Sequence, residues 1–244
     1  MVNFPDGGMG RRSIAFARPR ARRRRWFWLR ALVLMLTLVM VVFPVLLTLL
    51  FSVVPPPITP LMVIRLLSGS GLDKRWRSLE EISPAAAQAV VASEDNRFCQ
   101  HAGFDIRAIR QVLADYAAGE ALRGASTISM QVAKNVFLWP ARSALRKVLE
   151  AYLTLLIEGL WSKRRIIEVY LNVAEWGRGI YGIEAAAQHH FGKPASALNR
   201  REASLLAVVL PNPRQWSVKS AFVQHRAGII VRRMRQIEPL LDCL

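Results

Sequence analysis

The chain has 244 residues, of which 52% are hydrophobic, and a formal net charge of +17 at pH 7. That length accommodates one domain and an anchor, and so many apolar residues beside so large a charge are unusual for a soluble protein. Two cysteines are too few for a disulfide-rich scaffold. No zinc-finger, homeodomain or RNA-binding-sheet pattern accompanies the charge, so nucleic-acid binding is a distant alternative.

Residues 1–30 form a basic segment with nine arginines and one acidic residue, Asp6. An unbroken arginine cluster, residues 22–25, stands directly before the aromatic run Trp26-Phe27-Trp28. Next to an apolar segment, such a cluster is explained most simply by anionic lipid headgroups. We therefore predict that residues 1–30 lie on the cytoplasmic face of a membrane.

Residues 31–54 contain no charged side chain. A helix of that length spans about 36 Å, more than the roughly 30 Å hydrocarbon core of a bilayer. Pro44 within it is compatible with a bilayer helix. A cleaved signal peptide would have a shorter apolar core and a small-residue cleavage site, which Ser52-Val53-Val54-Pro55 supplies poorly. We predict one transmembrane helix over 31–54, which places residues 55–244 outside the inner membrane.

Three prolines at 55–57 begin a linker and membrane-proximal segment that we place at residues 55–82. From Ser83 to the end, apolar residues recur with helical spacing, and no sustained alternation of period two is present. Asp105 precedes one such helix, and Asn199 with Glu202 forms a capping-box pattern before another. The sequence predicts a mainly α domain over 83–244, with strands as minor elements.

Glu94 and Asp95 stand where the helix that starts at Ser83-Pro84 ends. The negative end of the helix dipole and the neighbouring Asp95 both disfavour a second charge, so we expect a raised pKa at Glu94. A carboxylate with a raised pKa suits a general base near neutral pH. An isolated Glu-Asp pair would more often end a helix in solvent, so the surrounding residues decide whether this pair belongs to an active site.

A second polar cluster follows Gly124-Ala125-Ser126, which resembles a helix start whose free N–H groups favour a phosphate. Thr127, Gln131 and Lys134 then share one helix face. An exposed helix surface is the ordinary explanation of such a stripe.

Arg146 and Glu150 lie four residues apart on a further helix, with Lys147 alongside. Taken alone, this spacing indicates an exposed ion pair that contributes about 0.3–0.5 kcal/mol.

Cys99 and Cys243 are far apart in the sequence, and Cys243 lies among the last residues, where order is often low. We expect no structural disulfide between them, although a pairing stays open. No Cys/His spacing indicates a zinc site.

Several blocks together resemble the peptidoglycan glycosyltransferases, the lipid II polymerases related in fold to lysozyme. They are E-D-N-R-F-x-x-H-x-G-F-D from Glu94, G-A-S-T-I-S-M-Q-V-A-K-N from Gly124, R-K-V-L-E from Arg146 and K-R-R-I-I-E-V-Y-L-N-V-A-E-W-G from Lys163. Y-G-I-E-A-A-A, F-G-K-P-A and L-P-N-P follow, so the resemblance runs from about residue 55 to 218. Met130, where the family usually has glutamine, and Cys99 depart from the pattern. No S-x-x-K or K-T-G is present, so the resemblance is to monofunctional members.

The resemblance implies a lysozyme-like helical domain that joins lipid II units by an inverting single displacement. It makes Glu94 the general base and Glu150 a second catalytic acidic residue that assists the pyrophosphate. It implies no covalent intermediate, unlike the retaining glycosidases. Substrate-binding roles follow for Asp95, Arg97, His101, Ser126, Thr127, Gln131, Lys134, Arg146 and Lys147. Asn172 and Glu175 are expected to shape the cleft.

The resemblance requires no cofactor, and Mg²⁺ is an optional one, held weakly by carboxylates and substrate phosphates. Expected partners are lipid II, the growing glycan strand and the membrane, with cell-wall synthesis or division proteins as further candidates. The two competing interpretations are a membrane-anchored lytic transglycosylase or lysozyme-like hydrolase, and an inactive cell-wall scaffold that binds partners. The polar stripe argues against the hydrolase, because cleaving a finished glycan releases no pyrophosphate.

Overall fold

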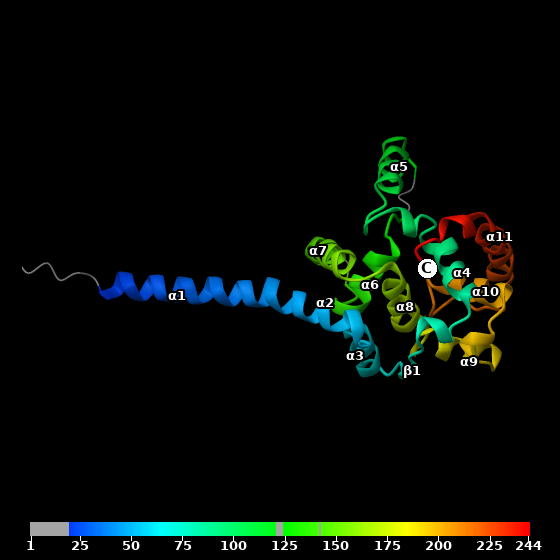
Figure 1. Ribbon diagram of the computed structural model, residues 1–244, viewed down its shortest axis with the longest axis horizontal. Helices are drawn as coiled ribbons and strands as arrows, with labels where there is room; N and C mark the ends of the chain where they lie inside the picture. The colour runs from blue at the N-terminus through cyan, green and yellow to red at the C-terminus, as the bar shows by residue number, and fades with distance from the viewer. Residues whose placement is uncertain (1–19, 121–123, 142) are drawn as a thin grey trace, which may run out of the picture. The chain divides into compact units, whose positions relative to one another are not determined.

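The computed structural model describes residues 20–120, 124–141 and 143–244, which divide into two compact units at Pro44 and Val45. The first nineteen residues of the predicted cytoplasmic segment lie outside the described residues. The elements are mostly helices (Figure 1), as predicted from the period of the apolar residues.

One helical run contains the predicted membrane segment. It consists of α1 (Arg20–Thr37), a π-helical turn η1 (Leu38–Val42) and α2 (Phe43–Val53). The stretch Trp26–Val53 is long and apolar enough to cross a membrane. Pro44 is the second residue after the π turn, and a proline ring clashes with the carbonyl four residues earlier, which lies within that turn, so the locally wider turn accommodates it. The apolar helix is consistent with a single-pass membrane anchor.

The end of α2 packs against the helices that follow it in the second unit. The indole N–H of Trp161 donates to the carbonyl of Thr48 at 2.7 Å. The Arg165 guanidinium donates to the carbonyls of Phe51 and Val54 at 2.9 and 2.8 Å. The two Arg165 contacts satisfy carbonyls at the helix C-terminus, which has no intrahelical donors left.

Helices dominate the rest of the second unit. In chain order the elements are α3 (Pro60–Leu67), β1 (Asp73–Lys74), η2 (Leu79–Glu81), α4 (Pro84–Glu94), η3 (Phe98–Gln100), α5 (Ile106–Ala117), α6 (Ile128–Phe137), α7 (Ala144–Leu160), α8 (Lys163–Val173), β2 (Glu175–Gly177), β3 (Ile180–Tyr181), α9 (Ile183–Phe191), η4 (Ala195–Ala197), α10 (Arg200–Val209), α11 (Ala221–Ile237) and η5 (Glu238–Leu240).

Side-chain caps define several of these helix starts, as the sequence predicted. The Asp105 carboxylate accepts from the N–H of Ala108, and Asn199 with Glu202 completes a capping box at α10. Ser83 begins α4 with Pro84 in its first turn, but its hydroxyl donates to the carbonyl of Leu198 instead of capping the helix. Local sequence therefore fixes most helix starts.

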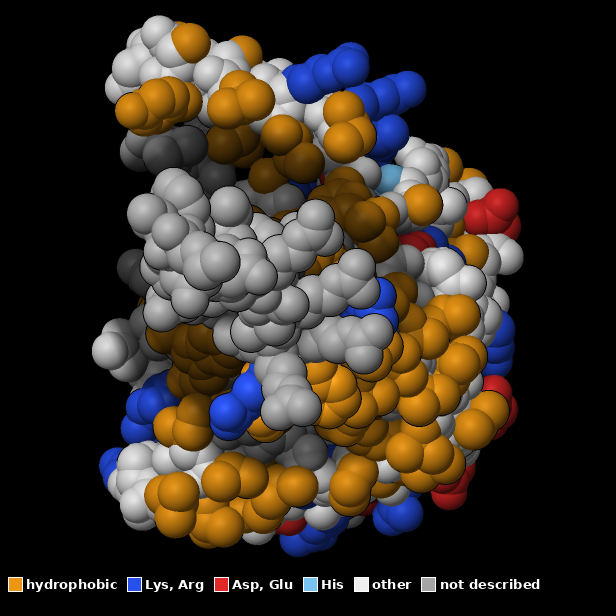
Figure 2. Space-filling model, turned by 90° about the vertical axis from the view of Figure 1, so that its left-hand side faces the viewer, with side chains coloured by type: hydrophobic (Ala, Val, Ile, Leu, Met, Phe, Trp, Pro, Cys, Tyr) orange, Lys and Arg blue, Asp and Glu red, His pale blue; other side chains and the backbone are white. Residues whose placement is uncertain are grey.

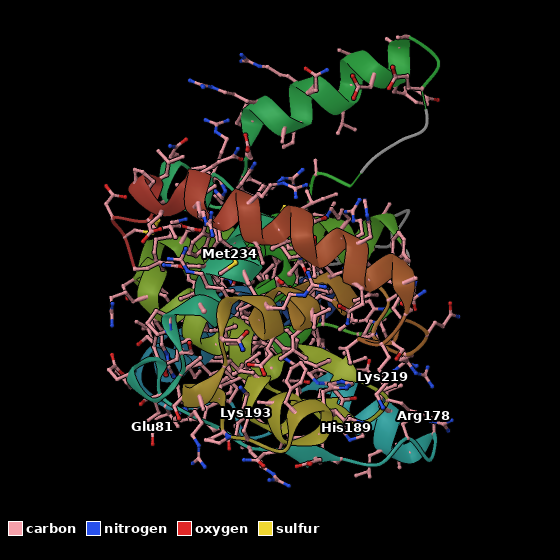
Figure 3. The ribbon with its side chains drawn as sticks, turned by 90° about the vertical axis from the view of Figure 1, so that its right-hand side faces the viewer. Glu81, Arg178, His189, Lys193, Lys219 and Met234 are labelled. Carbon is pink, nitrogen blue, oxygen red and sulfur yellow. A yellow bond between two sulfur atoms is a disulfide. The ribbon has the colours of Figure 1, made fainter. Side chains whose placement is uncertain are left out.

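The helices pack in two groups. α4 lies against α10 and α11, and α6 lies against α7 and α8 (Figure 1). Met234, fully buried, reaches from α11 into the core, whereas Lys193 and Lys219 lie at the surface (Figure 3). The core between the groups is built largely from small and branched residues, which lets the helices approach closely.

The three short strands form one sheet in the order β1-β3-β2. β1 runs parallel to β3, and β2 runs antiparallel to it with Glu175 opposite Tyr181. β2 and β3 follow directly after α8. The sheet therefore holds Glu175–Gly177, the end of the fourth sequence block, in place.

The helix α5 begins behind the predicted Asp105 cap, but its apolar stripe is not buried. Ile106, Leu113 and Tyr116 are 52%, 60% and 61% exposed, and none of the residues of α5 is buried. Figure 2 shows hydrophobic side chains on this helix at the top of the view, beside Lys or Arg side chains. The stripe is therefore available to a partner outside the domain.

The expectation of no structural disulfide is wrong. Cys99 and Cys243 are bonded, with their Cα atoms 5.5 Å apart. The chain end returns to lie beside α4 (Figure 1), which brings the second cysteine to the η3 turn. Sequence separation does not measure distance in a fold, and only the packing of α11 against α4 brings the two thiols together.

We expect the disulfide to stabilise the domain by about 2–5 kcal/mol, because it closes a long loop and so restricts the unfolded chain. A reducing agent should lower the thermal midpoint of the wild type and leave Cys243→Ser unchanged. Cys99→Ser is the matched control and should behave like Cys243→Ser. Equal midpoints for the wild type with and without reductant would contradict the expectation.

Candidate active site

Glu94 ends α4 with its side chain held by polar neighbours. Its carboxylate accepts from the side-chain amide of Gln131 at 2.9 Å and from the hydroxyl of Ser93 at 3.4 Å. The hydroxyl of Tyr170 donates to the other end of the Gln131 amide at 3.1 Å. The chain Tyr170–Gln131–Glu94 therefore fixes the carboxylate in one orientation.

Burial raises the pKa of Glu94, and the neighbouring Asp95 contributes in the same direction. Hydrogen bonds from Gln131 and Ser93 and the charge of Lys134 oppose the shift. The direction agrees with the prediction, but its main cause is desolvation, not the helix dipole that the sequence suggested.

A cavity of about 330 Å³ is lined by Gln131, whose amide donates to this carboxylate, whereas Glu94 itself is not part of the lining. Three of the predicted binding residues, Gln131, Lys134 and Arg146, line it. Burial lowers the pKa of Lys134, and the charge of Glu150 opposes that shift more than any other neighbour does. The cavity therefore carries cationic side chains next to the hydrogen-bonded Glu94.

The start of α6 differs from the prediction. The helix begins at Ile128 with Thr127 as its cap, not at Ser126. The N–H of Ile128 donates to Asp95 at 3.0 Å, and that of Met130 donates to Thr127 at 3.2 Å. Because protein groups already occupy these donors, the helix N-terminus is not an open phosphate site.

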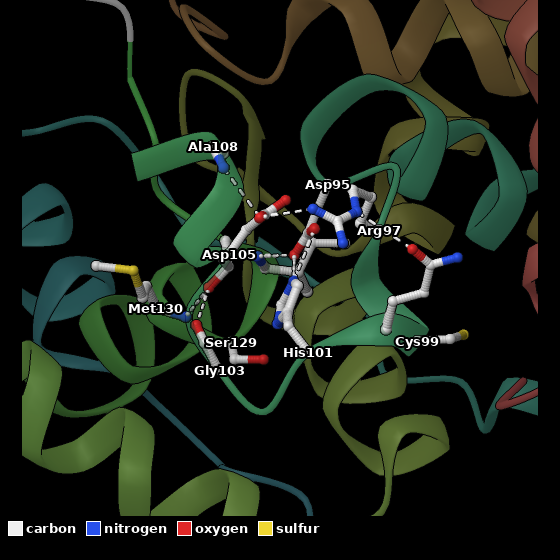
Figure 4. A network of polar contacts seen from close by, with 12 residues as sticks. Asp95, Arg97, Cys99, His101, Gly103, Asp105, Ala108, Ser129 and Met130 are labelled. Carbon is white, nitrogen blue, oxygen red and sulfur yellow. Dashed lines mark hydrogen bonds and ion pairs between the residues drawn. The ribbon is translucent and has the colours of Figure 1, made fainter. Parts of the chain in front are cut away.

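Asp95 joins the first sequence block to the second (Figure 4). Its two carboxylate oxygens lie 3.0 and 3.2 Å from Nε2 of His101, and one also accepts from Ile128. Arg97 donates to Asp105 at 3.0 Å, so it braces the start of α5. The structure thus places Asp95, Arg97 and His101 in a network that holds these elements together, and none of the three lines the cavity.

Thr127 and Gly103 complete that network. The Thr127 hydroxyl donates to the carbonyl of Gly103 at 2.6 Å while it caps α6. Gly103 has a φ of +87°, and a Cβ there would meet Thr154 at 2.8 Å. Only glycine fits this close approach to α7, and Thr127 itself is buried and lies outside the cavity lining.

Glu150 is buried between two cations. Arg146 donates to one carboxylate oxygen, and Lys147 donates to the other at 2.5 Å. Lys147 also donates to the hydroxyl of Ser126 at 3.3 Å. The predicted pair is therefore a buried carboxylate held by two cations, not the exposed surface pair that its spacing alone suggested.

Some cavity residues were not predicted as site residues. Tyr170 belonged to an apolar pattern, yet its hydroxyl reaches Gln131. Arg65 is the single charge of α3, and with Asn135 and Trp139 it lines the cavity. Of the residues expected to shape the cleft, Glu175 lines it, whereas buried Asn172 bonds both backbone groups of Arg77.

The residues present do not favour a resident Mg²⁺. Both oxygens of Glu150 are engaged by cationic side chains, which a metal would have to displace. Within the described ranges no group of three or more His, Cys, Asp or Glu side chains could hold a metal ion. The cationic side chains around Glu150 are Lys134, Arg146 and Lys147.

We predict unequal costs for removing the two partners of Glu150. Arg146 is 12% exposed and Lys147 is 47% exposed, so Arg146→Ala leaves the carboxylate without its more desolvated partner. The loss should be on the order of 1–3 kcal/mol for Arg146→Ala and smaller for Lys147→Ala. Thermal or urea unfolding of both variants in detergent measures the difference, and equal losses would contradict the burial argument.

We also predict a pH-dependent effect of Glu94→Gln. Because the folded-state pKa of Glu94 is raised, the folded protein binds more protons than the unfolded chain, and stability falls as pH rises above the ordinary value of 4.5. Glu94→Gln removes that loss, so its thermal midpoint relative to the wild type should increase from pH 4 to pH 7. Glu80→Gln is the control of opposite sign, since the pKa of exposed Glu80 is lowered. A flat difference for Glu94→Gln would contradict the raised pKa.

Comparison with known proteins identifies the family. The family model described as "Transglycosylase" matches residues 62–235. The biosynthetic peptidoglycan transglycosylase of Rhodospirillum centenum is 59% identical over 184 residues, which cover 74% of this chain and 80% of the relative. The proteins of the same name from Caulobacter vibrioides and Stutzerimonas stutzeri are each 52% identical, over 74% and 81% of this chain and 79% and 85% of their own lengths.

The matched region contains every cavity-lining residue except Leu61, as well as Glu94 and Glu150. On these matches the chain belongs to the transglycosylase family, with relatives named as biosynthetic peptidoglycan transglycosylases.

Proposed function

We propose that this protein polymerises lipid II into β-1,4-linked glycan strands and releases undecaprenyl pyrophosphate. The observation that carries the proposal is the partly buried Glu94 carboxylate, hydrogen-bonded to Gln131, which lines a cavity together with Lys134 and Arg146. A base next to a cationic cavity is what glycosyl transfer from a pyrophosphate donor requires.

In this mechanism Glu94 takes the proton from the 4-hydroxyl of the acceptor sugar. That oxygen attacks the anomeric carbon of the donor, the bond to pyrophosphate breaks, and the configuration inverts in a single displacement. Burial, which raises the pKa of Glu94, strengthens it as a base. The Gln131 amide, itself held by Tyr170, keeps the carboxylate oriented toward the reacting hydroxyl.

Charge stabilisation of the leaving pyrophosphate is assigned to Lys134 and Arg146. Both line the cavity, and both lie within electrostatic reach of Glu150. Glu150 is thus a catalytic residue that acts by holding Arg146 and Lys147 in place for the departing anion. The hydroxyl of Ser126 accepts from Lys147 and so belongs to the same hydrogen-bonded group.

The remaining predicted binding residues take a supporting part. Asp95, Arg97, His101 and Thr127 lie in hydrogen-bonded networks that fix the ends of α4, α5 and α6. We propose that they border the donor site and maintain its shape.

The proposed membrane location rests on the N-terminal segments and on features of the domain that follows them. We propose residues 1–30 as a cytoplasmic segment, 31–54 as a transmembrane helix, 55–82 as a linker and 83–244 as the catalytic domain outside the inner membrane. The Cys99–Cys243 bond supports an oxidising compartment for that domain. The exposed apolar residues of α5 and Leu67 of α3, 83% exposed, support its position against a lipid surface.

The test is incubation of detergent-solubilised protein with labelled lipid II. We expect the wild type to form lysozyme-sensitive polymer and Glu94→Gln to lose at least about a hundredfold in rate, the typical contribution of a general base. Glu80→Gln, at an exposed position outside the cavity, is the matched control and should retain wild-type rates.

The possible outcomes separate the candidate functions. Polymer from Glu94→Gln at the wild-type rate would keep the enzyme and remove Glu94 as the base. Cleavage of finished glycan without polymer would favour a hydrolase. No reaction from any variant, under conditions where a known polymerase works, would favour a partner-binding scaffold.

A further inference from the structure

The cavity lining contributed by α3 and β2 contains two charged side chains that the proposed chemistry does not use. Arg65 and Glu175 both line the cavity, and Nε of Arg65 lies 3.7 Å from Oε2 of Glu175. That distance is too long for a hydrogen bond. The side chains are 27% and 8% exposed, so this is a largely desolvated pair.

Three buried polar atoms at this place have no hydrogen-bond partner among the residues that the structure describes. They are Nε of Arg65, Oε1 of Glu175 and the hydroxyl of Tyr181. A buried polar atom left unpaired costs about 1–3 kcal/mol, and such atoms are uncommon in folded proteins. Arg65 and Glu175 line the cavity and Tyr181 is paired with Glu175 behind that lining, so the group indicates a place built for a polar ligand.

The strands hold this group in place. Glu175 and Tyr181 are opposite each other on β2 and β3, so their side chains share a face of the sheet. The backbone of Gly179 donates to Glu175. Burial raises the pKa of Tyr181 to about 12, so its hydroxyl stays protonated and can donate.

The unpaired atoms define the ligand that fits. Arg65 and Tyr181 need an acceptor, whereas Oε1 of Glu175 needs a donor. A phosphate or carboxylate would satisfy Arg65 but would meet the like charge of Glu175 and leave its oxygen unpaired. A secondary amide offers a carbonyl and an N–H together, without a charge.

We propose that Arg65 and Glu175 bind the acetamido group of an N-acetylhexosamine unit of the substrate, with Tyr181 positioned behind them. This inference rests on the proposed function, in which such sugars are joined. The amide N–H donates to Glu175 and the amide carbonyl accepts from Arg65. The subsite shares its cavity with Gln131, which links it to Glu94.

The experiment compares two substrates and two double variants. Lipid II carrying its acetamido groups and the analogue with free amines are offered to the wild type and to Arg65→Met/Glu175→Leu. Replacing both members of a buried pair by apolar side chains is often neutral for stability, so this variant should fold, which its thermal midpoint checks. Lys193→Met/Glu202→Gln is the matched control, since that pair is 29% and 20% exposed and lies outside the cavity lining.

We expect the wild type and the control to prefer the acetylated substrate by at least about tenfold in kcat/KM, because a site built for hydrogen bonds rejects an analogue that lacks them. The ratio of the two kcat/KM values should fall to about one in Arg65→Met/Glu175→Leu. An unchanged preference in that variant, with polymer still formed, overturns the subsite and leaves the proposed function intact.

A second readout does not depend on polymerisation. In saturation-transfer NMR, the acetyl methyl signals of soluble tetra-N-acetylchitotetraose should show strong transfer with the wild type and lose it with Arg65→Met/Glu175→Leu. If no polymer forms but this loss is observed, the function fails and the subsite stands. Equal transfer in both proteins overturns the subsite.

Discussion

The site depends on one carboxylate, that of Asp95. It bridges His101 and the first N–H of α6, and so fixes the end of α4 against the start of α6. Glu94 is the last residue of the first helix, and Gln131 lies one turn into the second. Because a buried carboxylate must be paired, the contact that satisfies Asp95 also sets the distance between Glu94 and the Gln131 amide that donates to it.

A second constraint couples the charges of the site. Burial raises the pKa of Glu94 and lowers that of Lys134, so desolvation disfavours the charged form of both. Each residue opposes the shift of the other, and Glu150 supports Lys134 more strongly. Glu94 and Lys134 therefore stabilise each other's charge, and they do so more strongly here than in bulk water, which would screen the attraction.

Local sequence predicted what local forces determine. The end of α4 at Glu94, the caps at Asp105 and Asn199 and the helical face of Gln131 and Lys134 depend on residues a few positions apart, and the structure confirms them. The start of α6 was placed too early, because the first N–H of the helix, that of Ile128, is satisfied by Asp95, a residue more than thirty positions away. The prediction of no disulfide failed for the same reason, since the bond depends on how α11 packs against α4.

The apolar stripe of α5 shows a further limit of periodicity. A helix that faces a protein core and one that faces a lipid or a partner have the same spacing of apolar residues, so the pattern predicts the helix but not what covers it. Arg65 is the converse case, since one arginine in an apolar helix gives no sign of its partner. The fold brings Glu175 from β2 to the cavity lining beside Arg65, and the cross-strand pairing places Tyr181 next to Glu175. The proposed function assigns the chemistry to motif residues near Glu94, whereas the proposed sugar subsite depends on contacts between segments that no single motif contains.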